Sequence, residues 1–167
     1  MLLIVLQNKE RSALNKKVCC ISGKRDIPPE SEKTIREKLR FQIQKAINDS
    51  YTIFICGFAR GTDIMAAEII IDFKKQLGNA ADIKLDAYLP YDKMQNSKKI
   101  KELLKECDYI TSCSPYYHRG CFLARDKIMA DNADMLIAVT DKEETGGTGY
   151  TIRCAEKNKI PIERILL

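Results

Sequence analysis

Four short turn segments of the sequence carry residue types that suit an anionic ligand. Each follows an apolar run and contains glycine or a small hydroxyl residue: residues 22–25, 57–63, 114–117 and 145–149. Glycine lets the backbone approach a ligand closely, and free N–H groups at the start of a helix attract phosphate. Arg25 and Arg60 add guanidinium groups that donate charge-assisted hydrogen bonds. Together the turns predict a phosphate-binding site, whereas a single glycine turn has the simpler role of joining a strand to a helix.

The segments before these turns are predicted to be strands of one sheet. Residues 18–21, 53–56 and 135–139 are continuous apolar runs, typical of parallel strands buried on both faces. Residues 83–89 alternate apolar with polar types, so we expect this strand at an edge with one face in water. Residues 109–113 and 161–166 are weaker strand candidates. Because ligands bind beyond the carboxyl ends of parallel strands, these strands would bring the turns to one edge of the sheet.

Amphipathic helices are predicted between the strands. Ile35, Leu39, Ile43 and Ile47 recur every four residues and form an apolar stripe, and Ser31 is a suitable N-cap for that helix. Further helical patterns cover residues 64–71, 100–107, 121–132 and 148–158. Strand and helix thus alternate five times before a last strand. This order predicts an α/β fold: a doubly wound, mostly parallel sheet of about six strands with helices on both faces.

Length and composition indicate one ordinary globular domain. The chain has 167 residues, of which 45% are hydrophobic and 31% charged. We assign residues 17–167 to a single domain and residues 1–16 to an N-terminal extension, an appended strand or arm. Lysine and arginine number 28 against 23 acidic residues, a net charge of +5. This balance permits an anionic ligand but is weaker than the basic excess typical of a nucleic-acid-binding domain.

The sequence is expected to be that of a cytoplasmic protein. No apolar run reaches the roughly 18 residues of a membrane span, and the apolar start, residues 1–6, is too short for the core of a signal peptide. The seven cysteines are then expected to stay reduced. No membrane partner is predicted.

Neither a metal nor a cofactor is expected. The chain has no G-x-G-x-x-G after the first predicted strand and no G-x-x-x-x-G-K-[ST]. A standard dinucleotide dehydrogenase or P-loop ATPase is therefore disfavoured. Cys107, Cys113, His118 and Cys121 are zinc-ligand types, but their spacing matches no common zinc module.

Five blocks of sequence resemble a known family in their order and spacing. They are residues 19–28 (CCISGKRDIP), 54–68 (FICGFARGTDIMAAE), 89–95 (LPYDKMQ), 125–131 (RDKIMAD) and 146–155 (GGTGYTIRCA). Over residues 17–166 the chain resembles the YpsA-like branch of the SLOG superfamily. Lys24 stands where histidine is frequent in that branch, and a cation at this position suits an anionic ligand.

The resemblance implies a Rossmann-like fold that binds or senses a nucleotide or nucleotide-derived ligand, in the setting of nucleotide signalling or phage defence. Asp63 and Arg125 also have simpler roles, the first as a charge at a helix N-terminus and the second as a solvated surface arginine. The predicted ligand-binding residues are Ser22, Gly23, Lys24, Arg25, Gly57, Phe58, Ala59, Arg60, Gly61, Thr62, Asp63, Ser114, Tyr117, Arg125, Gly146, Gly147 and Thr148.

Two other branches of the superfamily give alternative functions. Lonely Guy enzymes hydrolyse nucleoside 5′-monophosphates and carry P-G-G-x-G-T-x-x-E, whose glutamate aligns with Arg153. Arginine is no acceptor and cannot activate water or stabilise an oxocarbenium-like centre, so we expect binding without this hydrolysis. If the protein is such a hydrolase, the weak catalytic candidates are Arg125, Glu68 and Asp131. DNA-processing protein A suggests a single-stranded DNA-binding module, which the evenly spread charge disfavours.

A homodimer is the remaining partner expectation, because related proteins often form one. The apolar residues 1–6 then have two interpretations, packing between subunits or packing on the edge of their own sheet.

Overall fold

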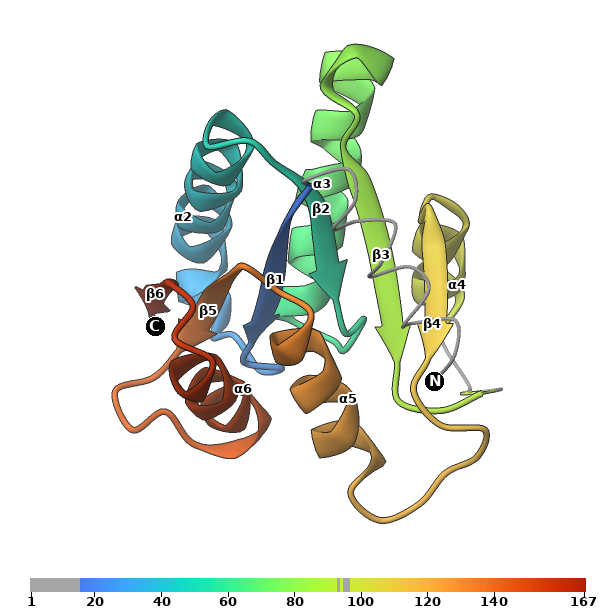
Figure 1. The fold of residues 1–167 in the computed structure, drawn as a ribbon. Helices are drawn as coiled ribbons and strands as arrows, with labels where there is room; N and C mark the ends of the chain where they lie inside the picture. The colour runs from blue at the N-terminus through green and yellow to red at the C-terminus, as the bar shows by residue number, and fades with distance from the viewer. Residues whose placement is uncertain (1–15, 93, 95–96) are drawn as a thin grey trace.

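A parallel sheet of six strands forms the centre of the structure (Figure 1). The structure is a computed structural model that describes residues 16–92, 94 and 97–167. The predictions for residues 1–6, and for all but the last residue of the N-terminal extension, lie outside these residues. The strands are β1 (Lys17–Gly23), β2 (Tyr51–Cys56), β3 (Lys84–Leu89), β4 (Tyr109–Ser112), β5 (Met135–Thr140) and β6 (Ile162–Leu166).

The strand order reverses at β1. In space the strands run β4-β3-β2-β1-β5-β6, and every neighbouring pair is parallel. The chain therefore builds the sheet outward from β1 to β4 and then returns to place β5 on the other side of β1. This topology confirms the predicted α/β, Rossmann-like doubly wound fold. It also makes the carboxyl ends of β1 and β5 the point where successive connections leave in opposite directions.

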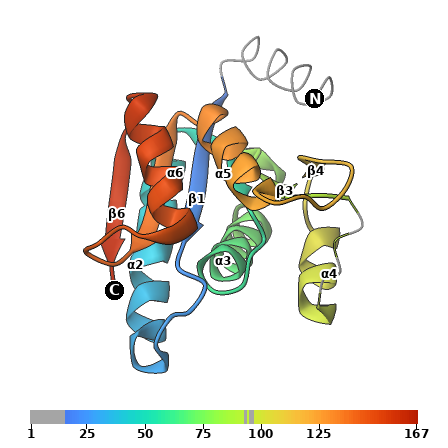
Figure 2. The same cartoon turned by 90° about the horizontal axis from the view of Figure 1, so that it is seen from below.

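Helices cover both faces of the sheet, in two layers that Figure 2 shows from below. One layer holds α2, α3 and α4, and the other holds α5 and α6. Successive residues of β1 project to opposite layers: Cys19 packs in the core under α2 and α3, and Cys20 packs in the core under α5 and α6. The helices are α2 (Pro29–Asn48), α3 (Thr62–Leu77), α4 (Lys98–Lys105), α5 (Cys121–Asp131) and α6 (Gly146–Lys157), with a 3₁₀ turn at Gly78–Ala81.

The prediction that residues 83–89 form an edge strand is wrong. β3 lies between β2 and β4, and the true edges are β4 and β6. Asp86 and Tyr88, which suggested a wet face, are 1% and 0% exposed. Alternation in this strand thus reflects two buried faces of different polarity, because α5 and the buried groups around it cover the side that was expected to face water.

The predicted cap of the first helix is also wrong. α2 begins at Pro29, with Pro28 at the N-cap and no side-chain capping bond. Ser31 lies inside the first turn, where its N–H donates to the carbonyl of Pro28 at 2.9 Å. Proline at the first helical position is favoured because its fixed φ already suits a helix and it lacks an N–H that would be left unpaired. The predicted apolar stripe is confirmed at Ile35, Leu39 and Ile43, which are all buried.

No helix among the described residues is both long and apolar enough to cross a membrane. All seven cysteines are free thiols.

Candidate functional site

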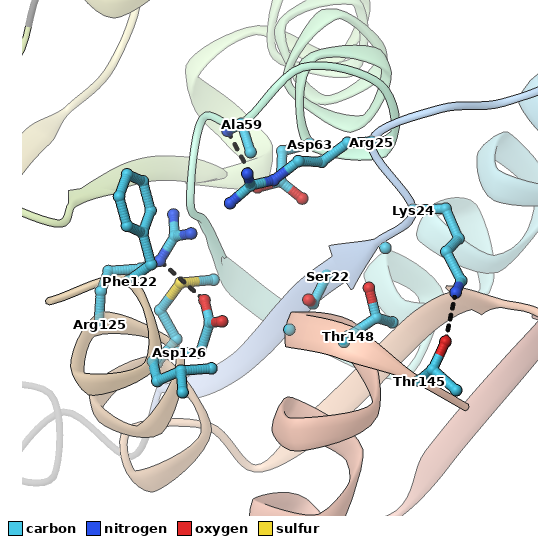
Figure 3. A pocket seen from close by; sticks show the side chains of 15 residues that line it. Ser22, Lys24, Arg25, Ala59, Asp63, Phe122, Arg125, Asp126, Thr145 and Thr148 are labelled. Atoms are coloured by element: carbon cyan, nitrogen blue, oxygen red, sulfur yellow. Dashed lines mark hydrogen bonds and ion pairs between the residues drawn. The ribbon is translucent and has the colours of Figure 1, made fainter. Parts of the chain in front are cut away.

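A cavity of about 330 Å³ opens beyond the carboxyl ends of β1 and β5, where the sheet order reverses (Figure 3). Its walls come from the turn after β1, the start of α3, one face of α5 and the first turn of α6. The lining residues are Ser22, Gly23, Lys24, Arg25, Ala59, Asp63, Phe122, Leu123, Arg125, Asp126, Met129, Thr145, Gly146, Gly147 and Thr148. Doubly wound sheets bind their ligands at this point, so the topology alone predicts a ligand site in the cavity.

The first turn of α6 forms part of the wall of this cavity. Thr145 is the N-cap, and its side chain makes no capping hydrogen bond. Within the helix the first bonded N–H belongs to Gly149, which donates to the carbonyl of Thr145 at 3.3 Å. The N–H groups of residues 146–148 precede that bond, and the positive end of the helix dipole adds to them. Such a helix start favours phosphate or another anion.

Lys24 adds a positive charge beside the start of α6. Its ammonium group pairs with Asp141 in the turn after β5 and donates to the hydroxyl of Thr145 at 3.3 Å. The hydrogen bond from Lys24 lowers the pKa of Asp141. The lysine therefore connects the turns that follow β1 and β5 and keeps its charge at the mouth of the cavity.

A cluster of buried charges forms the opposite wall. Arg125 on α5 is only 3% exposed, and its guanidinium donates to the carbonyl oxygens of Gly57 and Tyr88, the second at 3.4 Å. Its Nε lies 2.8 Å from a carboxylate oxygen of Asp126. Asp63, at the start of α3, accepts the N–H of Ala59 at 3.1 Å. One arginine thus joins the ends of β2 and β3 to the two acidic residues that line the cavity.

Both carboxyl groups of this cluster are harder to ionise than usual. Burial raises the pKa of Asp63 to about 6, although Arg125 and the Ala59 N–H lower it. Burial also raises the pKa of Asp126, against the opposing effect of Arg125. A carboxyl group that titrates near neutrality in a cavity can serve as a hydrogen-bond acceptor or a proton carrier.

Two glycines make the close packing of this region possible. A Cβ on Gly57 would collide with the Arg125 guanidinium, so glycine at this position admits the arginine to the ends of the strands. Gly61 has φ of +79°, and a Cβ on it would collide with the carbonyl oxygens of Lys24 and Arg25. Both glycines shape the site by packing.

An aromatic and aliphatic wall completes the cavity. Phe122, Leu123 and Met129 lie on α5, and the guanidinium of Arg25 sits 5.4 Å from the centre of the Phe122 ring. Cation–π contact at this distance holds the arginine over the mouth of the cavity. The wall offers an apolar surface on which a sugar or a base can pack.

A family model described as the YspA SLOG family, YpsA, matches residues 28–165, most of the chain. The chain belongs to the YpsA family of SLOG proteins. A UPF0398 protein of Lysinibacillus sphaericus (strain C3-41) is 26% identical over 128 residues, covering 74% of this chain and 72% of the relative. A UPF0398 protein of Bacillus thuringiensis (strain Al Hakam) is 22% identical over 131 residues, covering 74% and 70%.

Two solved structures share the fold of this YpsA-family chain. One is DNA processing protein A from Helicobacter pylori, described with its single-stranded DNA binding mode. It has a TM-score of 0.63 and 21% identity over 92% of this chain and 67% of that protein. The other is TM1055, with a TM-score of 0.58 and 14% identity over 87% of this chain and 72% of that protein.

The structure brings ten of the residues predicted from the sequence of this YpsA-family protein to the cavity. They are Ser22, Gly23, Lys24, Arg25, Ala59, Asp63, Arg125, Gly146, Gly147 and Thr148. The surface position considered for Arg125 is wrong, since the side chain is buried.

The other seven predicted residues are not among those that line the cavity: Gly57, Phe58, Arg60, Gly61, Thr62, Ser114 and Tyr117. Phe58 is buried, and the Thr62 hydroxyl donates to the Lys24 carbonyl at 3.0 Å, so both support the turn after β1. Ser114 bonds within its own loop, to the carbonyl of Tyr116 at 2.8 Å. Tyr117 packs edge-on against Tyr91, which in turn contacts Phe122.

Of the three catalytic candidates, only Arg125 lines the cavity. Glu68 lies on α3 in a second cavity, between Arg36 and Lys99. Asp131 ends α5 and bonds Lys127 and Asn158.

Five lining residues were not predicted as ligand-binding: Phe122, Leu123, Asp126, Met129 and Thr145. Four of them lie on α5, where helical spacing places residues 122 and 129 on the face of Arg125. This spacing was a usable signal once Arg125 had been considered for the site. The described residues contain no group of three or more His, Cys, Asp or Glu side chains arranged to hold a metal ion.

Proposed function

We propose that this protein binds a nucleotide or a nucleotide-derived ligand in the cavity between β1 and β5 and acts as a binding or sensing protein. The observation that carries the proposal is the first turn of α6, which lines the cavity beside the ammonium of Lys24 and precedes the first bonded N–H of the helix, that of Gly149. Phosphate is the ligand group that this combination favours.

The rest of the cavity suits the remaining parts of a nucleotide. Phe122 and Met129 provide an apolar wall for a base or a ribose. The carboxyl groups of Asp63 and Asp126 can accept hydrogen bonds from ribose hydroxyls or from base N–H groups. The phosphate of the ligand would thus lie at the α6 side of the cavity, and its hydroxyl and N–H donors at the α5 side.

Nucleotides are expected to stabilise the protein against heat. A panel of nucleoside mono-, di- and triphosphates and ADP-ribose, tested by thermal shift, should contain at least one ligand that raises the melting temperature. At a ligand concentration of 100 times Kd, one-site binding adds about 2.7 kcal/mol to the free energy of unfolding.

Lys24→Gln and Lys127→Gln form a matched pair for this test. Each removes one ammonium from a Lys–Asp ion pair, but only Lys24 lines the cavity. Lys24→Gln is expected to reduce the shift, and Lys127→Gln to leave it unchanged. A panel without any shift in the wild-type protein would refute the proposed function.

Hydrolysis of nucleoside monophosphates is expected to be absent. Arg153, at the position of the Lonely Guy glutamate, is exposed and is not among the cavity residues. The cavity carboxylates, Asp63 and Asp126, share the charge of Arg125 and are not free to stabilise an oxocarbenium-like centre. Incubation with AMP and related monophosphates should release no ribose 5-phosphate. Turnover near the ~1–10³ s⁻¹ of ordinary enzymes, lost in Asp126→Asn, would show a hydrolase.

Single-stranded DNA binding is the second candidate, favoured by the fold shared with DNA processing protein A. It predicts affinity for oligonucleotides that falls steeply with salt, because each phosphate contact releases counterions. Fluorescence anisotropy at two salt concentrations separates it from binding of a small nucleotide.

A further inference from the structure

A second cavity, of about 310 Å³, lies on the other side of the turn after β1 and is lined from α2, α3 and α4. It is lined by Arg25, Ile27, Glu32, Arg36, Arg60, Gly61, Ile64, Met65, Glu68, Ser97, Lys99 and Ile100. The proposed nucleotide site does not use it. Its residues combine an excess of positive charge with an apolar floor.

The charge of this second cavity is positive because two cations share one acid. Glu68 lies 2.7 Å from Arg36 and 2.6 Å from Lys99, so one carboxylate balances half of their charge. Arg60 pairs with the exposed Asp26 at 2.9 Å, at the rim. In all, four cationic side chains and two carboxylates line the cavity. The guanidinium and ammonium groups carry more N–H donors than the two carboxylates can engage, so an anion that enters the cavity can accept hydrogen bonds from them.

The floor of the second cavity is aliphatic. Ile64 and Met65, from the first turns of α3, are 8% and 4% exposed, and Ile27 and Ile100 face them from the neighbouring elements. An apolar floor under a charged rim suits a ring whose oxygen atoms accept hydrogen bonds better than a bare inorganic ion, which would leave the aliphatic surface uncovered.

Arg25 belongs to both cavities. Among the described residues it is the one that lines both the first and the second cavity, and its exposed side chain reaches over Phe122. The backbone below it is fixed, because the N–H of Thr62 donates to the Lys24 carbonyl at 3.1 Å and Gly61 packs against the same turn. The turn after β1 therefore forms the wall between the two cavities, and the guanidinium of Arg25 lies on this wall.

We propose that the ligand of this protein is a dinucleotide, with one nucleoside in each cavity and the linking phosphate at Arg25. The inference rests on the proposed function, since it assumes that the first cavity binds a nucleotide. The second nucleoside packs its ring on Ile64 and Met65, and its base and ribose oxygens accept hydrogen bonds from Arg36 and Lys99. The class of ligand follows from two ring-sized cavities that share one phosphate-binding side chain.

The test compares AMP, GMP, CMP and UMP with pApA, pGpG, pCpC and pUpU by isothermal titration calorimetry. At least one dinucleotide should bind about tenfold or more tightly than its mononucleotide, because it gains contacts in the second cavity. Arg36→Gln combined with Lys99→Gln should abolish this advantage and leave mononucleotide affinity unchanged. Arg40→Gln is the matched control: it removes a charge from the next turn of α2, where Arg40 pairs with Asp72 at 3.5 Å, outside both cavities.

The outcomes separate this inference from the proposed function. Equal affinity for mononucleotide and dinucleotide, insensitive to Arg36 and Lys99 but reduced by Lys24→Gln, overturns the dinucleotide and keeps the first cavity as a nucleotide site. No binding of any of these probes overturns the dinucleotide, and only a thermal-shift panel without any shift overturns the proposed function as well. Affinity that continues to rise up to strands of about ten nucleotides, with steep salt dependence, overturns the dinucleotide in favour of single-stranded nucleic acid.

Discussion

Arg125→Ala is expected to lower the free energy of unfolding by about 3–5 kcal/mol at neutral pH, the usual cost of removing one partner from a buried ion pair. The arginine is 3% exposed and holds the carbonyls of Gly57 and Tyr88 together with the carboxylate of Asp126. Without it, Asp63 and Asp126 would be two buried carboxyl groups without a neighbouring buried cation. The chain has no tryptophan, so urea unfolding is best followed by circular dichroism.

The stability lost in Arg125→Ala should be smaller at acid pH and in a double variant. Arg125 lowers the pKa values of Asp63 and Asp126, so its removal raises both further and makes the two acids easier to protonate as the pH falls. The stability deficit should therefore be smaller at pH 5 than at pH 8. Arg125→Ala with Asp126→Asn should lose less than the sum of the single changes. Arg153→Ala, on the exposed side of α6, serves as the control, with a change within about 0.5 kcal/mol. If Arg125→Ala and Arg153→Ala changed the free energy of unfolding equally, the stabilising role of the buried Arg125 cluster would be contradicted.

The central strands and most of the cavity could be predicted because they depend on local signals. Continuous apolar runs identified β1, β2 and β5, and the topological rule placed the turns after β1 and β5 at one edge. Ser22 to Arg25 and Gly146 to Thr148 follow from that placement alone. No side-chain detail was needed, because backbone N–H groups and glycines carry this part of the site.

The remaining parts of the site depend on contacts between segments far apart in the sequence. The periodicity of apolar residues predicts local elements and does not indicate such contacts. Arginine in a helix is usually solvated, and only the missing Cβ of Gly57, 68 residues away in sequence, lets Arg125 enter the interior. Asp86 and Tyr88 gave the pattern of a wet strand face, although β4 and α5 enclose them. The second cavity likewise needs Arg36, Glu68 and Lys99 from three separate helices.

Asp63→Asn is expected to stabilise the protein at pH 8 by up to about 3 kcal/mol. The pKa of Asp63 is about 6 in the folded protein, above its ordinary value of 3.8, because burial disfavours the charged form. The folded state therefore binds this proton more tightly than the unfolded state, and wild-type stability rises as pH falls from above 6 towards 4. Asparagine resembles the neutral acid and can still accept the N–H of Ala59. The gain should be full at pH 8 and vanish near pH 4.

Asp82→Asn provides a control of opposite sign. A hydrogen bond from Lys16 lowers the pKa of Asp82, so the loss of its charge should cost a little stability at pH 8. A carboxylate that destabilises the fold where it lines a cavity is the pattern expected of a group kept for binding rather than for stability. Asp63→Asn should accordingly gain stability while losing part of the thermal shift that nucleotides give, because one acceptor for the ligand is weakened. A stabilised variant with an undiminished nucleotide shift would remove Asp63 from the binding site and leave its buried charge without a role in ligand recognition.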